Sequence, residues 1–133
     1  AVDDEFQAIS DVVRGADLIA STPRQIWLQR CLGYATPRYA HLPVATNAAG
    51  EKLSKQTRAP ALPIEQAAEA LVAALNFLGQ ATPEGLAHAG LREIWRWAFQ
   101  RWSFADIPRQ AECFRDWRPG SGCRSPNVRD HTR

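Results

Sequence analysis

A lysine-rich segment, Lys52-Leu53-Ser54-Lys55-Gln56, follows a short apolar run and a glycine turn. The apolar run, His41 to Thr46, is rich in β-forming residues and predicts a strand, and Asn47 to Gly50 predicts a turn. Two lysines on a loop beside a strand edge suit the phosphates of a nucleotide. Their ammonium groups can neutralise the charge that develops between the α- and β-phosphates as pyrophosphate leaves. An exposed polar loop without a ligand is the alternative interpretation.

The residues upstream of this segment predict a strand end and one clear helix. Val2 to Asp4 could end a strand, and Phe6 to Leu18 has mixed spacings that predict a short helical or turn-rich stretch broken at Arg14-Gly15. Ser21-Thr22-Pro23 predicts a helix start, because a hydroxyl can cap free N–H groups and proline suits the first turn. Leu32-Gly33 predicts the end of that helix.

Downstream of the segment the chain becomes helical in character. Ile64 to Leu78 places apolar residues on one face and predicts a strong helix that ends at Gly79. Leu91 to Trp102 predicts a second helix with an aromatic-rich face, and Ile107-Pro108 predicts the start of a last short one. The expected fold is therefore mostly α with a few short strands.

Composition places the chain among globular proteins and against several other classes. With 45% hydrophobic and 23% charged residues, it does not resemble a disordered chain. Its most apolar stretch, Ala67 to Leu78, is too short to span a bilayer. The three cysteines show no metal-ligand spacing, so neither a disulfide framework nor a zinc site is expected, and a reducing cytoplasm is the expected location.

Charge is distributed unevenly along the chain. The stretch from Arg24 to Arg58 holds six basic residues and one acidic residue, although the whole chain has a net charge of +2. A polyanion would bind here, and a solvated basic surface stripe is the alternative. The chain also lacks methionine. We therefore expect a fragment or a processed piece that lacks a substantial N-terminal part.

Five blocks together resemble the class I aminoacyl-tRNA synthetases, in their glutamyl branch. The KLSKQ segment resembles the KMSKS signature, and the other blocks precede it in the order and spacing of that branch: Val2-Asp3-Asp4, Val13-Arg14-Gly15-Ala16-Asp17-Leu18, Ser21-Thr22-Pro23-Arg24-Gln25 and His41-Leu42-Pro43. The extended block from Lys52 to Leu62, KLSKQTRAPAL, is closer to the glutamyl-Q tRNA(Asp) synthetases than to full-length glutamyl-tRNA synthetases. The resemblance is dense from Val2 to Leu62 and looser from there to Trp102.

The resemblance implies roles for matching residues. Arg14 matches the arginine that binds a carboxylate of the glutamate substrate, and a structural salt bridge to Asp11 or Asp17 is the alternative. Lys55 matches the lysine that contacts ATP and is the expected catalytic residue. The implied ATP-binding loop consists of Lys52, Leu53, Ser54, Lys55 and Gln56, in which Lys52 and Ser54 shape the loop. Asp3 and Asp4 receive no role beyond positioning or capping, and His41 is expected to be a packed histidine.

The resemblance also implies an architecture. Residues 1–59 would be the C-terminal portion of a Rossmann-type catalytic domain, residues 60–118 a small helical domain, and residues 119–133 a flexible tail. The HIGH-type ATP motif and a cysteine-rich zinc insert would belong to the missing N-terminal half, so no metal site is expected in this chain and the chain alone is expected to be inactive. ATP is implied as a substrate, with Mg²⁺.

The implied reaction is ATP-dependent activation of glutamate as an adenylate, followed by transfer to queuosine in the anticodon of tRNA(Asp). Glutamate, ATP and tRNA(Asp) are thus the implied partners of a monomeric, non-membrane enzyme. Two alternatives remain: a fragment of an ordinary glutamyl-tRNA synthetase, and a non-catalytic helical module that binds polyanions.

The aromatic helix admits two interpretations. Its aromatic residues interleave with Arg92, Arg96 and Arg101, a pattern found in nucleic-acid-binding proteins. Trp95, Ala98 and Trp102 also recur at helical spacing, however, which favours burial in a core. We therefore expect these three residues to be core residues and the arginines on the outer face to be candidates for tRNA contact.

Overall fold

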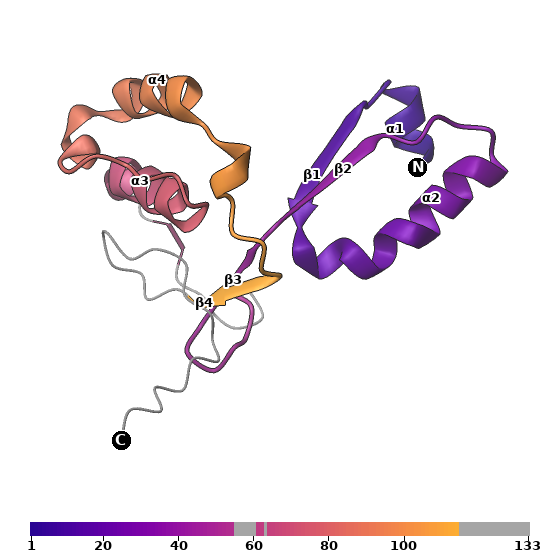
Figure 1. Cartoon of the computed structure of the whole chain (residues 1–133), viewed down its shortest axis with the longest axis horizontal. Helices are drawn as coiled ribbons and strands as arrows, with labels where there is room; N and C mark the ends of the chain where they lie inside the picture. Colours follow the sequence, from indigo (N-terminus) through magenta and orange to yellow (C-terminus); the bar gives the residue numbers. More distant parts are fainter. Residues whose placement is uncertain (55–60, 63, 115–133) are drawn as a thin grey trace.

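The computed structural model describes residues 1–54, 61–62 and 64–114, and about half of these are helical. The α-helices are α1 (Val2–Phe6), α2 (Thr22–Cys31), α3 (Ala67–Phe77) and α4 (Leu91–Arg101). The strands are β1 (Asp11–Gly15), β2 (Arg38–Leu42), β3 (Val44–Thr46) and β4 (Glu112–Phe114). Short 3-10 segments are η1 (Ala16–Ser21), η2 (Ile64–Gln66), η3 (Leu86–Ala89) and η4 (Phe104–Asp106). In Figure 1, β1, β2 and α2 lie at one end, α3 and α4 lie at the other, and β3 and β4 lie between them.

The N-terminal part is a β-α-β unit. Strands β1 and β2 pair in parallel, with Asp11 opposite Arg38 and Gly15 opposite Leu42. Parallel strands need a crossover connection, and α2 supplies it. The predicted helix start at Thr22-Pro23 and the stop at Gly33, whose φ is +72°, are confirmed. The block that begins at Val13 and the block that begins at His41 therefore lie at the carboxyl ends of β1 and β2, at one edge of this unit.

Two predictions for the first eighteen residues are wrong. Val2 to Asp4 lies in α1 rather than at the end of a strand, and the region expected to be helical or turn-rich contains β1. Val12 and Val13 favour a strand, but a five-residue strand gains its stability from a partner. That partner, β2, lies 27 residues further along the chain, as the pairing of Arg14 with His41 shows. Local spacing does not reveal a pairing of this range.

The predicted strand from His41 to Thr46 is divided in two by Pro43. Proline has no N–H to donate to a strand ladder, so β2 ends before it and β3 begins after it. Strand β3 then pairs in parallel with β4, with Ala45 opposite Cys113. The predicted turn at Asn47 to Gly50 is confirmed, since Oδ1 of Asn47 accepts from the backbone N–H groups of Ala49 and Glu51 at 3.0 and 2.9 Å.

Helices α3 and α4 pack against each other and against η3. Their shared core consists of Leu75, Leu86, Ile94 and Ala98. The predicted helix stop at Gly79 is confirmed, with a φ of +78°. Directly after it, Gln80 is buried and holds the segment that follows α4: its Nε2 donates to the carbonyl of Ser103 at 3.0 Å, and its Oε1 accepts from the N–H of Ser103 at 2.8 Å.

Three further predictions about this half are wrong. Trp95 is 49% exposed, because Ile94 and Ala98 occupy the core side of α4. Ile107-Pro108 opens no helix, since the chain runs extended there towards β4. Cys113 is disulfide-bonded, although the spacing of the cysteines in the sequence argued against a disulfide framework. The distance between two cysteines in the folded chain decides whether they pair, and their spacing in the sequence does not reveal that distance.

The domain boundary near residue 60 and the expected tail at 119–133 lie outside the described residues. Among the residues that are described, no helix is both long and apolar enough to cross a membrane.

Candidate functional site

Arg14 lies near the carboxyl end of β1, and its guanidinium is held by neighbours from three elements. Nη2 donates to Oγ1 of Thr22 at 2.7 Å and to the carbonyl of Leu18 at 3.4 Å, and Nε donates to Nε2 of His41 at 3.3 Å. The guanidinium carbon also lies 5.2 Å from the ring centroid of Tyr39, a cation–π distance. Arg14 is therefore fixed in one orientation before any ligand arrives.

The contact with Arg14 determines the tautomer of His41. A guanidinium N–H can only donate, so Nε2 of His41 must accept, and the ring proton then resides on Nδ1. Oγ1 of Thr22 lies 3.0 Å from the same Nε2 and can give its proton either to it or to the carbonyl of Leu18 at 3.3 Å. His41 also stacks on Tyr39, with ring centroids 6.3 Å apart. The histidine is packed, as expected, but it also belongs to the Arg14 network.

Arg14 keeps donors for a ligand. Nε and Nη2 are engaged, whereas no acceptor for Nη1 is found among residues 1–54, 61–62 and 64–114. A guanidinium that is held on one side and open on the other can bind a carboxylate with charge-assisted hydrogen bonds. Lysine cannot reproduce this planar geometry.

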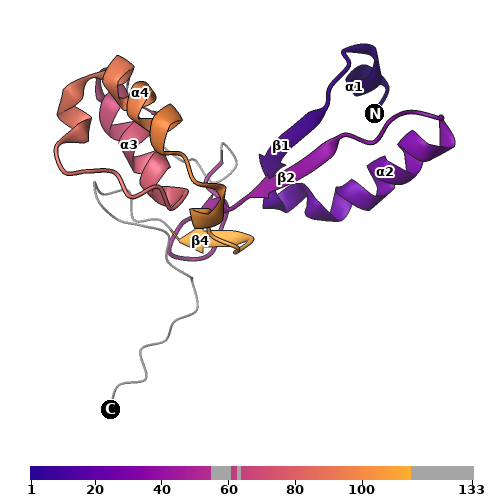
Figure 2. The ribbon, with the colours of Figure 1, turned by 45° about the horizontal axis from the view of Figure 1, so that its top comes forward.

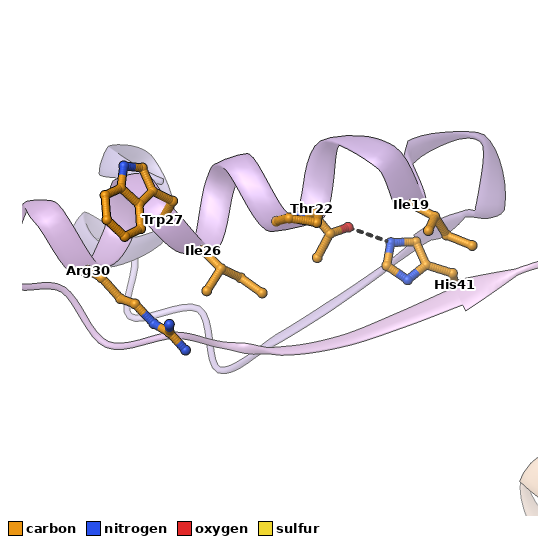
Figure 3. A pocket seen from close by; sticks show the side chains of 7 residues that line it. Ile19, Thr22, Ile26, Trp27, Arg30 and His41 are labelled. Atoms are coloured by element: carbon orange, nitrogen blue, oxygen red, sulfur yellow. Dashed lines mark hydrogen bonds between the residues drawn. The ribbon is translucent and has the colours of Figure 1, made fainter.

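An open cavity of about 400 Å³ runs along α2 beside this network (Figure 3). Thr22 and His41 lie towards one end of it, Ile26 and Trp27 belong to its apolar wall, and Arg30 lies towards the other end. Arg14 is not among the residues that line the cavity, but it bonds to two that do, Thr22 and His41. Thr22 and Arg30 are two helical turns apart, which is roughly 12 Å along the helix axis. This distance is larger than the distance between the two carboxylates of one small amino acid.

The lysine loop begins at the same edge of the β-α-β unit. Nζ of Lys52 forms an ion pair with Oδ2 of Asp17 at 2.6 Å, and Asp17 follows Arg14 closely in the chain. The hydrogen bond from Lys52 holds the pKa of Asp17 below its usual value of 3.8. Lys52 also forms an isolated antiparallel bridge with Thr46, which fixes the start of the loop against β3. The predicted loop residues Leu53 and Ser54 follow directly and are partly buried, whereas Lys55 and Gln56 lie outside the described residues.

The alternative role of Arg14, a salt bridge to Asp11 or Asp17, is not what the structure has. Asp11 pairs with Nε of Arg38 at 2.7 Å, and this contact lowers the pKa of Asp11 and raises that of Arg38. Asp17 pairs with Lys52. Both carboxylates thus have another cation as partner.

The remaining acidic candidates lie elsewhere. Asp3 and Asp4 belong to the first turn of α1, where neither side chain caps the helix. Within the part of the chain that the structure describes, no group of three or more His, Cys, Asp or Glu side chains could hold a metal ion.

Sequence reasoning found Arg14 but missed the residues that hold it. Thr22 was interpreted only as a helix opening, and Tyr39 was given no role. The pairing of β1 with β2 brings Tyr39 and His41 to Arg14, and α2 brings Thr22. An alternation of polar residues in β2, with Tyr39 and His41 on one face, is the signal that could have found them.

Comparison with known proteins relates this chain to one family. The model of the family described as tRNA synthetases class I (E and Q), catalytic domain, matches residues 1–100. A glutamyl-Q tRNA(Asp) synthetase of Dechloromonas aromatica is 64% identical over 83% of this chain and 36% of its own length. Proteins of the same name from Aromatoleum aromaticum and Chromobacterium violaceum are 58% and 51% identical, over 84% and 80% of this chain and 35% of their own length. The chain thus spans about a third of the length of these curated relatives.

Proposed function

This chain belongs to the class I tRNA synthetases of the E and Q type, through their catalytic domain, and we propose that it is part of an enzyme that attaches glutamate to queuosine in the anticodon of tRNA(Asp). The name shared by its relatives supports this acceptor over the tRNA(Glu) of an ordinary glutamyl-tRNA synthetase. The β-α-β unit with parallel strands is compatible with a Rossmann-type nucleotide-binding sheet, whose ligands bind at the carboxyl ends of the strands.

One observation carries the proposal: the ion pair between Lys52 and Asp17 joins the lysine loop to the strand end that bears Arg14. An enzyme that forms an acyl-adenylate must hold an amino acid and a nucleoside triphosphate side by side. A fixed guanidinium suits the amino acid, and a cationic loop next to it suits the triphosphate. A fixed guanidinium alone, or a cationic loop alone, would not distinguish such a site from a surface ion pair.

The residues take the following roles in this reaction. Arg14 binds a carboxylate of glutamate through its open Nη1 edge, and Lys55 contacts ATP and stabilises charge as pyrophosphate leaves. Lys52 and Ser54 position the loop. The glutamate α-carboxylate attacks the α-phosphate, forming a C–O–P bond while the bond to pyrophosphate breaks, so the protein supplies orientation and charge stabilisation rather than a nucleophile.

Mg²⁺ would accompany ATP, whose phosphate oxygens would be its ligands. Because the chain covers about a third of its relatives, we expect activity to need parts of the enzyme beyond this chain. The cytoplasm, where tRNA is aminoacylated, is the proposed location.

Glutamate-dependent exchange of labelled pyrophosphate into ATP tests the proposal on the full-length enzyme. Exchange that proceeds without tRNA, followed by transfer of labelled glutamate to queuosine-containing tRNA(Asp), is the expected result. Unmodified tRNA(Asp), which has guanosine at the same position, is the matched control and should accept no glutamate.

Two other outcomes would contradict the proposal. Exchange that requires tRNA(Glu), with transfer to its 3′ end, would identify an ordinary glutamyl-tRNA synthetase. The absence of exchange with any amino acid, together with salt-sensitive binding of nucleic acid, would identify a non-catalytic polyanion-binding module.

A further inference from the structure

The outer face of α4 carries an aromatic pair that the core does not use. Ile94 is 0% exposed and Ala98 is 5% exposed, and they form the buried side of the helix. On the other side Trp95 is 49% exposed and Phe99 is 82% exposed. Helix α4 lies on the opposite end of the molecule from the β-α-β unit (Figure 2). This pair is therefore distinct from the Arg14 site.

The two rings form one surface. Trp95 and Phe99 are four residues apart on a helix, so their side chains are neighbours. Their ring centroids lie 5.9 Å apart with an angle of 28° between the planes. Leu91, one turn earlier and 45% exposed, extends the same stripe. The helix that carries them is fixed, since α4 packs on α3 and η3.

Positive charge flanks this surface. Helix α4 contains three exposed arginines and one glutamate. Arg92 and Arg96 lie on the side of Trp95 and Phe99, whereas Arg101 lines a cavity with Trp97 on another face. Nη1 of Arg96 pairs with Glu93 at 3.1 Å. Exposed aromatic rings beside arginines are the elements of a surface that binds unpaired nucleotides, because bases stack on the rings and guanidinium groups attract the phosphates.

We propose that Trp95 and Phe99 form a stacking surface for an unpaired base of an RNA loop, with Arg92 holding an adjacent phosphate. This inference rests on the proposed function, in which the substrate is an RNA. A double helix fits less well, because its bases are stacked within the duplex and present no free ring face. The sequence-based argument against nucleic-acid binding was that Trp95, Ala98 and Trp102 fill the core. Ala98 is buried and Trp102 packs against the core, but Trp95 is 49% exposed.

Fluorescence anisotropy with two labelled RNAs tests this surface in the full chain. The probes are a stem–loop with the sequence of the anticodon arm of tRNA(Asp) and a fully paired duplex of equal length. We expect the double variant Trp95→Ala/Phe99→Ala to bind the stem–loop about tenfold more weakly, as the loss of one stacked base predicts, and the duplex within about twofold of the original. Phe6→Ala, which removes a 90% exposed ring on α1, is the matched control and should change neither.

Salt dependence separates stacking from charge. The double aromatic variant should keep the original slope of log affinity against log salt, whereas Arg92→Gln should reduce that slope by about one. Phe99→Ala alone provides a second variant, because so exposed a ring contributes little to folding. Thermal unfolding monitored by circular dichroism should be the same for Phe99→Ala and the original chain.

Three outcomes would overturn the stacking surface: unchanged stem–loop affinity, equal losses for stem–loop and duplex, or loss of self-association in sedimentation without an effect on RNA. The last would identify a second copy as the occupant. These outcomes can be distinguished from a failure of the proposed function, which pyrophosphate exchange measures separately. If the enzyme shows no pyrophosphate exchange but Trp95→Ala/Phe99→Ala still weakens binding of the stem–loop, the proposed function is wrong and the stacking surface stands.

Discussion

Replacing Gly79 by alanine should destabilise the protein through two separable effects. Gly79 ends α3 with a φ of +78°, a conformation that costs an L-residue about 1–2 kcal/mol. An added Cβ would also overlap the backbone carbonyl oxygen of Asp106 and lie 3.5 Å from Cδ of Pro108. Because the obstacle is backbone, the segment after α4 must move away.

The displacement of the segment after α4 determines how far Gly79→Ala lowers the free energy of unfolding. Moving the segment would break the two hydrogen bonds between Gln80 and Ser103, at 3.0 and 2.8 Å, each worth about 1 kcal/mol. Gly79→Ala should therefore lower the free energy of unfolding by about 3–4 kcal/mol. Gly85→Ala is the matched control, since Gly85 has the same φ of +78° and open space around its Cα. It should cost only about 1–2 kcal/mol.

Urea unfolding followed by circular dichroism at 222 nm measures both variants against the original chain. The informative quantity is the difference between the two variants, about 2 kcal/mol, because the cost of positive φ cancels. Equal destabilisation of Gly79→Ala and Gly85→Ala would refute the close approach of Asp106 to α3. A lower hydrogen-exchange protection at Ser103 in Gly79→Ala alone would support it.

Three further predictions concern the candidate site. Arg14→Lys in the full-length enzyme should raise the KM for glutamate at least tenfold, from the loss of charge-assisted hydrogen bonds, whereas Arg38→Lys on the same sheet should leave it unchanged; a similar KM in both variants would remove Arg14 from the site. Lys55→Ala should slow pyrophosphate exchange strongly with the urea midpoint unchanged, and normal exchange kinetics would end the assignment of the loop. The ion pair of Asp17 with Lys52 should be complete above the unfolded pKa near 3.8 and lost as the pH falls through the lowered folded pKa. In carboxyl-¹³C NMR titrations Lys52→Ala should raise the pKa of Asp17, and an unshifted midpoint would contradict the pair.

The sequence predicted those elements whose causes are local. Helix α2 follows from its proline start and glycine stop, and the turn at Asn47 follows from its side chain, which replaces a backbone acceptor. Strand β1 was missed because its stability depends on β2, a distant partner. The exposure of Trp95 was missed because helical periodicity identifies a face but does not say which face the core covers.

The candidate site likewise has one part that the sequence predicted and another part that only the structure shows. The resemblance of the Val13 to Leu18 block to the glutamyl branch is what singled out Arg14 as a candidate. Its surroundings, Thr22, Tyr39 and His41, come from a helix start and a neighbouring strand, so only the assembled unit reveals that the guanidinium is immobilised.

A single buried proline separates β2 from β3, so both two-stranded sheets share one unbroken length of backbone. The pyrrolidine ring restricts φ to about −65°, which stiffens the chain at the residue between them. His41, one residue before the end of β2, is thus separated from Val44 by only Leu42 and Pro43. The strand that contacts Arg14 through His41 and the strand that bridges to Lys52 through Thr46 are therefore joined by a single residue of backbone.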